Sequence, residues 1–146
     1  MWRRQENAFG LIELLVVMAI VGMLVAIAAP SMGRWLAIMR INATARAIAS
    51  KLQLSRMLAI SQNSRFRLSF NTDDRTYQIQ QRIGGTWEDV KERTSLPPGI
   101  TLVSASGNPE FESLGTVPES TTIVVRNALG STRTIHVSAV GRVKIE

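Results

Sequence analysis

Cysteine is absent from this sequence of 146 residues, and histidine occurs once, at His136. Without cysteine the chain has no disulfides and no thiolate metal ligands, and a single histidine excludes a multi-histidine metal site. His136 also lies in an apolar, alternating stretch, which argues against a histidine-based catalytic triad. Serine and acidic residues show neither nucleophile-elbow nor phosphate-loop spacing. We therefore expect no enzymatic activity, no metal and no cofactor.

Charged residues are absent from residues 14–33, and the apolar residues, 45% of the chain, are concentrated near its N-terminus. Twenty helical residues at a rise of about 1.5 Å span roughly 30 Å, the thickness of a bilayer's hydrocarbon core. Arg3 and Arg4 precede this run, so the positive-inside rule places the N-terminus in the cytoplasm and everything after Arg34 outside it. Trp35 stands where an interfacial anchor belongs.

The helical pattern continues beyond the apolar run to about Ser61. Pro30 lies inside it, and because proline removes a backbone hydrogen bond and clashes with the preceding turn, we expect a kink there. After Arg34 the pattern becomes amphipathic, which predicts that one helix face covers a globular domain. The predicted buried stripe consists of Ile41, Ala45, Ile48, Leu52, Ser55 and Ala59.

Residues 62–146 show the alternation and the turn signals of short β-strands. Residues 66–70 and 77–79 alternate around a polar turn and predict a hairpin. Residues 100–103 predict another strand, and residues 121–146 predict a three-stranded meander. The expected fold is therefore α+β, with a long N-terminal helix whose second half packs on a small antiparallel sheet.

The net charge is +6, and removal of the first eight residues would leave 15 basic and 10 acidic residues, or +5. Such a surplus favours contact with acidic lipid headgroups or with nucleic-acid phosphates. The basic residues are dispersed, however, and a dispersed surplus is more often a solvated face than a nucleic-acid footprint.

The junction between the polar start and the apolar helix reads RRQENA-FGLIELLVVMAIVGMLVAIAAP. It resembles the class III signal of type IV pilins and type II secretion pseudopilins, in which a short basic leader ends at a small residue before Phe. The resemblance implies that prepilin peptidase cuts between Ala8 and Phe9 and N-methylates Phe9, with Glu13 and Pro30 in the family's positions. Ala8 replaces the usual Gly, and Gly10 the usual Thr. A cut after Gly10 would make Glu13 only the third residue, which favours the Ala8–Phe9 cut.

Cleavage before Phe9 would supply a partner for the Glu13 carboxylate. A lone carboxylate in a membrane helix costs about 3 kcal/mol at depth unless it is paired or close to the interface. Cleavage before Phe9 creates an α-amino group about one turn away, and in a packed bundle that ammonium can meet Glu13 of a neighbour. Such a pair would set the axial register, as a buried polar group does in a coiled coil.

Two simpler interpretations of the N-terminal run compete with this one. Ala26-Ile27-Ala28 offers a small-x-small site for ordinary signal peptidase cleavage. The carboxylate of Glu13 inside the run, Pro30 just after the site and the continuing helical pattern argue against that cleavage. Alternatively, residues 14–33 form a plain single-span anchor in which Glu13 is merely interfacial.

The C-terminal part resembles the GspH/FimT family of minor pilins and pseudopilins, whose members show a Phe, a Gly, a β-hairpin and a closing strand with Gly-Arg. The matching residues are Phe111, Gly115, Gly130, Gly141 and Arg142. The resemblance implies a minor pseudopilin of a type II secretion system, a structural subunit of a periplasmic filament that helps export folded proteins. The acidic calcium-binding loop of the major pseudopilin has no counterpart, and the adjacent Asp73 and Asp74 fit a hairpin turn better than a metal site.

An alternative within the same family is a FimT-like minor type IV pilin that binds DNA for uptake through a basic Gly-Arg strand. In a strand Arg142 and Lys144 share one face, and Arg133 on the neighbouring strand would extend the patch. Such a site would contact phosphates and weaken steeply with salt. The competing interpretation is a solvated edge strand whose charges discourage aggregation, and the lack of a denser basic cluster favours it.

Pattern and resemblance together divide the chain into a leader (1–8), a transmembrane and assembly half-helix (9–33), an amphipathic half-helix (34–61) and a β-rich periplasmic domain (62–146). The implied location is the bacterial inner membrane, crossed once, and a periplasmic filament after assembly. The implied partners are other pilin or pseudopilin subunits, prepilin peptidase, the inner-membrane assembly platform and, before assembly, membrane lipid. DNA is the less favoured partner.

Overall fold

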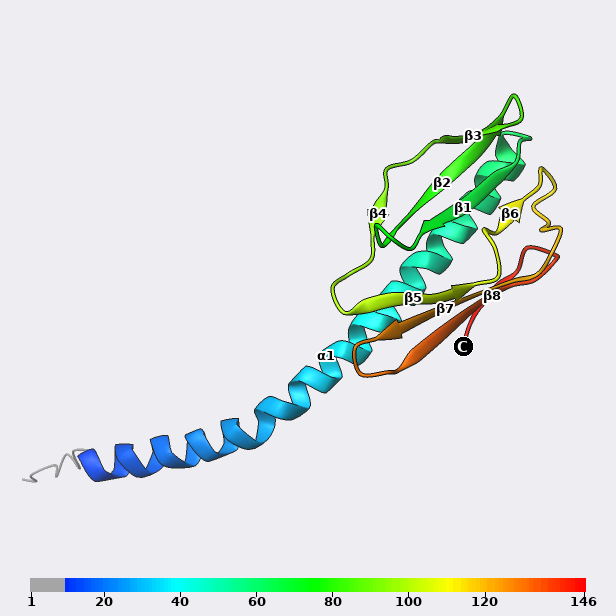
Figure 1. Ribbon diagram of the computed structural model, residues 1–146. Coiled ribbons are helices and arrows are strands. Elements are labelled where there is room, and N and C mark those ends of the chain that lie inside the picture. Colours follow the sequence, from blue (N-terminus) through cyan, green and yellow to red (C-terminus); the bar gives the residue numbers. More distant parts are fainter. Residues whose placement is uncertain (1–9) are drawn as a thin grey trace, which may run out of the picture. The chain divides into compact units, whose positions relative to one another are not determined.

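The computed structural model describes residues 10–146, and the side chains of residues 10–27 and 32–146. Within this part of the chain one helix, α1 (Leu11–Ser61), precedes nine short strands (Figure 1). The helix ends at Ser61, which confirms the predicted end. The chain divides into two compact units, Met1–Leu36 and Ala37–Glu146, and each is described by itself below.

The strands form two antiparallel sheets. The first contains β1 (Phe66–Asn71), β2 (Thr76–Ile83), β3 (Thr86–Asp89) and β6 (Glu110–Phe111) in the order β3-β2-β1-β6, and β4 (Thr94–Ser95) pairs with β2 outside this path. The second contains β5 (Ile100–Ala105), β7 (Thr121–Asn127), β8 (Thr132–Val137) and β9 (Val143–Ile145) in the order β5-β7-β8-β9. The predicted hairpin is β1 and β2, and the predicted meander is β7, β8 and β9.

The fold class is confirmed as α+β, but the structure holds two small sheets where one was expected. The change of sheet occurs at Pro97 and Pro98, between β4 and β5. Proline has no backbone N–H to donate to a ladder, so the strand that pairs with β2 cannot continue through this segment. The chain turns at Gly99, whose φ is 80°, and β5 then pairs with β7.

One face of the second half of α1 forms the core of the domain together with both sheets. All six residues of the predicted stripe are buried, and none is more than 1% exposed. The five apolar residues of the stripe share one hydrophobic cluster with side chains from both sheets, including Phe66, Phe111, Ile123 and Ile135. Ser55 is the polar member, and its hydroxyl donates to the Lys51 carbonyl at 2.9 Å. The spacing of apolar residues every three or four positions therefore predicts the buried face of this helix correctly.

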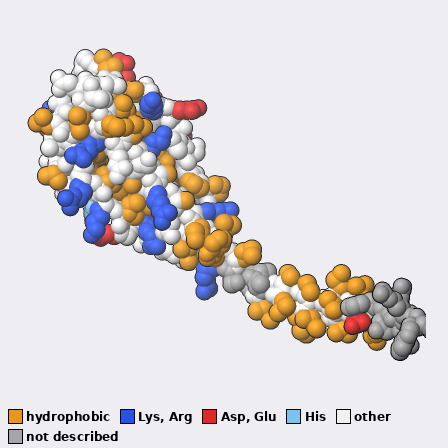
Figure 2. All heavy atoms as spheres, turned by 180° about the vertical axis from the view of Figure 1, so that it is seen from behind, with side chains coloured by type: hydrophobic (Ala, Val, Ile, Leu, Met, Phe, Trp, Pro, Cys, Tyr) orange, Lys and Arg blue, Asp and Glu red, His pale blue; other side chains and the backbone are white. Residues whose placement is uncertain are grey.

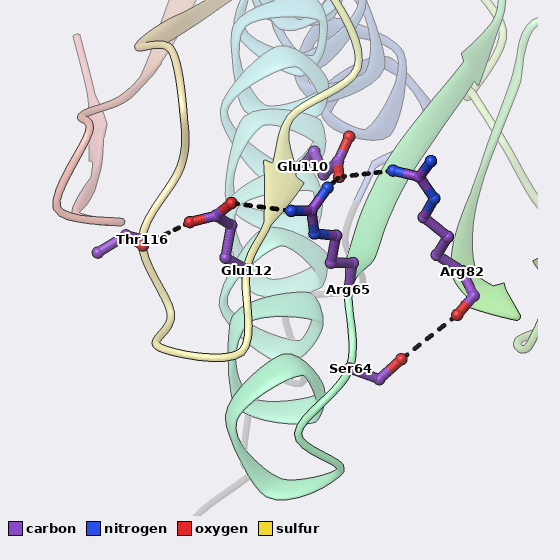
Figure 3. Close-up of polar contacts among 6 residues, drawn as sticks. All are labelled: Ser64, Arg65, Arg82, Glu110, Glu112 and Thr116. Carbon is purple, nitrogen blue, oxygen red and sulfur yellow. Dashed lines mark hydrogen bonds and ion pairs between the residues drawn. The ribbon is translucent and has the colours of Figure 1, made fainter. Parts of the chain in front are cut away.

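Short strand β6 is held beside β1 by charged side chains as well as by its ladder (Figure 3). The Arg65 guanidinium lies between Glu110 and Glu112, with N–O distances of 3.4 Å to each carboxylate. Arg82 approaches Glu110 at 3.9 Å from the neighbouring strand. These side chains are partly exposed, so each pair contributes at most about 1 kcal/mol.

Candidate functional site

Three of the predicted functional positions lie outside what the structure describes. Ala8 and Phe9 precede the described residues, so the predicted cleavage and methylation stay predictions. Pro30 belongs to residues 28–31, whose side chains are not described, and the predicted kink also stays a prediction.

Glu13 lies in the first turn of α1, where the Gly10 carbonyl accepts hydrogen bonds from the backbone N–H groups of Glu13 (2.9 Å) and Leu14 (3.3 Å). A carboxylate in this turn is favoured by the helix dipole, typically by about 0.3–1 kcal/mol. Every residue from Leu11 to Ile27 is exposed, including Leu11 at 79% and Ile27 at 75%. Glu13 is thus the single acidic group on an apolar helix surface that nothing in the described chain covers.

By length and composition, no single helix among the described residues qualifies to cross a membrane, whereas the bent pair Leu11–Ile27 and Met32–Ser61 could do so together.

The predicted Gly-Arg pair forms the turn between β8 and β9. The Gly141 N–H donates to the Ser138 carbonyl at 2.8 Å, and the Ser138 N–H donates to the Arg142 carbonyl at 3.0 Å. Gly141 is buried with φ 74°, and a Cβ there would overlap the Gly115 carbonyl oxygen. Gly141 is therefore required by the close approach of the Gly115 backbone, whereas a Cβ at Gly115, whose φ is 76°, would meet the Ile60 and Arg56 side chains of α1.

Arg56 of α1 joins these two segments and was not identified from the sequence. Its Nε donates to the Gly115 carbonyl at 2.9 Å, and its Nη2 donates to the Val140 carbonyl at 3.4 Å. The sequence shows Arg56 only as one of several basic residues on the helix. Its role depends on contacts 59 and 84 residues away in the chain, which no local pattern reports.

A groove of about 640 Å³ lies between the end of α1 and the β8–β9 turn. Its lining includes the exposed apolar side chains Met57 and Val140 together with Arg56 and Arg142, and it contains no acidic residue. Arg142 thus lines a groove of mixed character together with four apolar side chains, Met57, Ile60, Val140 and Val143. A double-stranded nucleic acid is instead held mainly by clustered basic side chains.

The three basic residues of the predicted DNA patch do not share one face. Lys144 pairs across the ladder with His136, and its Nζ lies 2.7 Å from the Glu146 carboxylate. Arg133 lies two residues before the buried Ile135 in β8, so both side chains lie on the same side of the sheet. The Arg133 Nε donates to the Asn42 side chain of α1 at 2.8 Å. Because side chains alternate along a strand, Arg133 lies on the helix side of the sheet and Lys144 on the opposite side. Arg133 therefore does not share the sheet face of Lys144, and the assignment of these residues to DNA stays a prediction.

His136 is part of this outer cluster. Its Nδ1 lies 3.1 Å from the Thr122 hydroxyl, and its Nε2 lies 3.5 Å from the Glu146 carboxylate. The hydrogen bond from Lys144, followed by the charges of Lys144 and His136, lowers the pKa of Glu146. These contacts connect His136 of β8 to β7 on one side and to Glu146, which follows β9, on the other.

Asp73 and Asp74 lie in the β1–β2 turn. Their backbone N–H groups donate to the Asn71 side-chain oxygen at 3.0 and 3.1 Å, and Arg93 approaches Asp74 at 3.8 Å. The turn alone therefore accounts for the acidic pair. Among the described residues, no group of three or more His, Cys, Asp or Glu side chains is placed to hold a metal.

Comparison with protein families gives two matches. The prokaryotic N-terminal methylation motif matches residues 3–29, and the type II transport protein GspH matches residues 44–141. The first match ends within α1 before the boundary between the two units, and the second begins within α1 after it. The apolar and the globular parts of the chain are therefore matched by separate family models. No curated protein sequence is similar enough to match.

Two solved structures have a similar fold. The minor pseudopilin EpsH from the type 2 secretion system of Vibrio cholerae is 17% identical with a TM-score of 0.63, and the match covers 73% of this chain and 96% of EpsH. The type IV minor pilin FimU of Pseudomonas aeruginosa is 18% identical with a TM-score of 0.62, covering 73% of this chain and 87% of FimU. At such low identity these matches establish the fold, and one neighbour comes from a secretion system while the other comes from a pilus.

Proposed function

Because the chain belongs to the GspH family of type II transport proteins, we propose that it is a minor pseudopilin of a type II secretion system. Proteins of this family are structural subunits rather than enzymes, and the N-terminal methylation motif implies a membrane anchor. In the proposed role, the subunit joins a periplasmic pseudopilus that helps export folded proteins. Its anchor crosses the inner membrane once, with the N-terminus cytoplasmic and the globular domain periplasmic.

The observation that carries this proposal is the uncovered apolar helix surface with one carboxylate. Residues 11–27 expose aliphatic side chains on every side and contain Glu13 as their single charge. A helix that is apolar all round is stable only in lipid or among other helices. A subunit that lies in lipid as a precursor and among other helices in a filament meets both conditions. The apolar helix therefore fits a filament that is assembled from membrane precursors.

The proposed mechanism begins with cleavage between Ala8 and Phe9 by prepilin peptidase, followed by N-methylation of Phe9. The subunit then leaves the bilayer at the assembly platform and exchanges lipid contacts for contacts with neighbouring helices. Glu13 pairs with the new N-terminal ammonium of an adjoining subunit. An unpaired carboxylate at depth costs about 3 kcal/mol, so the register that pairs it is favoured by a similar amount.

The test is substitution of Glu13 in a secretion-competent host lacking the native gene. Glu13→Leu should leave the precursor in the membrane yet lower its recovery in sheared or cross-linked filaments and lower export of a folded substrate. Glu13→Gln keeps the size of the side chain but not its charge and should fail in the same way. Mass spectrometry of the wild-type protein should find a methylated Phe9 as the first residue.

The matched control is Glu119→Leu, which removes an exposed carboxylate from the globular domain. It should assemble and support export like the wild type. Normal filament recovery and export with Glu13→Leu, or a mature N-terminus at Ala29, would overturn the proposal.

The DNA-uptake alternative has weaker support, because Arg133 faces the helix and Lys144 is engaged by Glu146. A gel-shift assay of the full chain in detergent at low salt distinguishes the two functions. We expect no shift with double-stranded DNA. A shift that disappears in Arg142→Ala with Lys144→Ala would assign the chain to DNA binding instead.

A further inference from the structure

Basic and acidic residues are unequally distributed in the globular unit. Residues 37–61 and 120–146 contain eight Lys or Arg residues and one acidic residue, whereas residues 62–119 contain six basic and eight acidic residues. On the face shown in Figure 2, Lys and Arg side chains predominate over Asp and Glu. The second half of α1 and the C-terminal strands therefore carry the surplus of positive charge in the domain.

Three chain segments come together at one end of the domain, here called the basic end (residues 37–42, 97–101 and 126–134). The Asn127 side chain donates to the Ala37 carbonyl at 3.3 Å and so ties the β7–β8 turn to the helix. Arg40 lies in the same small hollow as Pro98 and Asn127. The three segments together contain Arg40, Arg126 and Arg133 but no Asp or Glu.

The basic end also exposes aliphatic side chains. Leu129 at the tip of the β7–β8 turn is 55% exposed, and Met39 on the helix is 47% exposed. The turn is well defined, because the Asn127 side-chain oxygen accepts from the backbone N–H groups of Leu129 (3.1 Å) and Ser131 (2.8 Å). Exposed aliphatic groups beside arginine are the combination that binds an anionic lipid interface.

Chain connectivity keeps the basic end close to the predicted anchor. The uncharged run ends at Gly33. Ala37 follows Gly33 by four residues, or about 6 Å along a helix. This separation is less than one Debye length at physiological salt, about 8 Å. Arg40 follows Gly33 by seven residues, or about 10 Å along a helix, and would therefore lie close to one Debye length from the end of the uncharged run.

We propose that, before assembly, the basic end binds anionic phospholipid headgroups through Arg40 and Arg126, with Leu129 in contact with the interface. This proposal rests on the membrane anchor proposed above but not on the secretion role. It gives the precursor a docked position on the membrane, from which the domain must be released when the subunit enters a filament.

The test uses the absence of cysteine to label one site. Full-length Leu129→Cys carrying an environment-sensitive fluorophore is reconstituted in vesicles of phosphatidylcholine, with or without phosphatidylglycerol. We expect a blue-shifted emission only with phosphatidylglycerol, reversed by high salt. Each arginine near an anionic surface contributes about 1 kcal/mol, or roughly fivefold, so Arg40→Gln with Arg126→Gln should lower the docked-to-free ratio roughly 30-fold.

Two controls keep the outcome interpretable. A label at Leu114→Cys, in the loop held by Arg56 about 28 Å along the helix from Ala37, should show no lipid-dependent shift. Arg142→Gln with Lys144→Gln removes the same charge elsewhere and should leave the Leu129 label unchanged.

Vesicle flotation at high salt reports the anchor independently. An unshifted Leu129 label in chains that still float would overturn the proposal, and would point to an acidic protein as the partner of the basic end.

Discussion

At the scale of single residues, Gly141 is the glycine, among those the structure describes, at which an added Cβ would make the closest contact. Its φ of 74° and the Gly115 carbonyl beside it leave no room for a side chain. A left-handed conformation alone costs an L-residue about 1–2 kcal/mol, and the overlap adds to that cost. Gly141→Ala should therefore destabilise the full chain by more than about 2 kcal/mol in urea unfolding in detergent micelles.

Gly130 provides the matched comparison, since its φ is 84° but an added Cβ would meet nothing within 4 Å. Gly130→Ala should cost only the conformational part, about 1–2 kcal/mol. Equal losses in the free energy of unfolding of the two variants would show that the close contact between the Gly115 and Gly141 segments contributes nothing to the cost of Gly141→Ala.

Tyr77 is the only tyrosine, and its burial raises the pKa of the phenol above the ordinary value of 10.0. Because the native state disfavours the phenolate, the unfolded state loses its proton first as the pH rises. The contribution of Tyr77 to stability is thus complete below pH 10 and is lost between that pH and the native pKa. Absorbance titration should give a higher midpoint for native than for urea-unfolded protein, and Tyr77→Phe should reduce the alkaline loss of stability.

At the scale of elements, the amphipathic half of α1 is the main structural support of the domain. Ile48 is fully buried in the core cluster, whereas Ile60 on the same helix is 51% exposed. Ile48→Ala should cost about 2–5 kcal/mol, because it removes buried methyl groups and leaves a cavity. Ile60→Ala makes the same chemical change at the surface and should cost less than about 1 kcal/mol, as measured by the same unfolding experiment.

The helix and the hairpins could be predicted from the sequence because their signals are local. The spacing from Ile41 to Ala59 defines a buried helix face without any tertiary information, and the alternation around residues 71–76 defines a turn. The pairing of β5 with β7, the contacts of Arg56 and the direction of Arg133 depend on segments far apart in the chain. Those contacts are decided by packing, so local patterns report neither the division into two sheets nor the side of the sheet on which Arg133 lies.

At the scale of the whole molecule, the chain separates into a part that needs an apolar environment and a part that does not. Every residue of the core cluster follows Ala37, with Ile41 the first. Removing residues 1–36 therefore takes away none of the core residues that the structure describes, while it removes the exposed apolar surface of residues 11–27.

A fragment of residues 37–146 should consequently be soluble without detergent and unfold in one cooperative transition. Its free energy of unfolding should lie within about 1 kcal/mol of that of the full chain in micelles, since helix residues outside the core contribute little beyond propensity. Circular dichroism in urea and size-exclusion chromatography measure both properties. A fragment that aggregates, or that unfolds without cooperativity, would mean that the first 36 residues stabilise the domain and that anchor and domain form one folding unit.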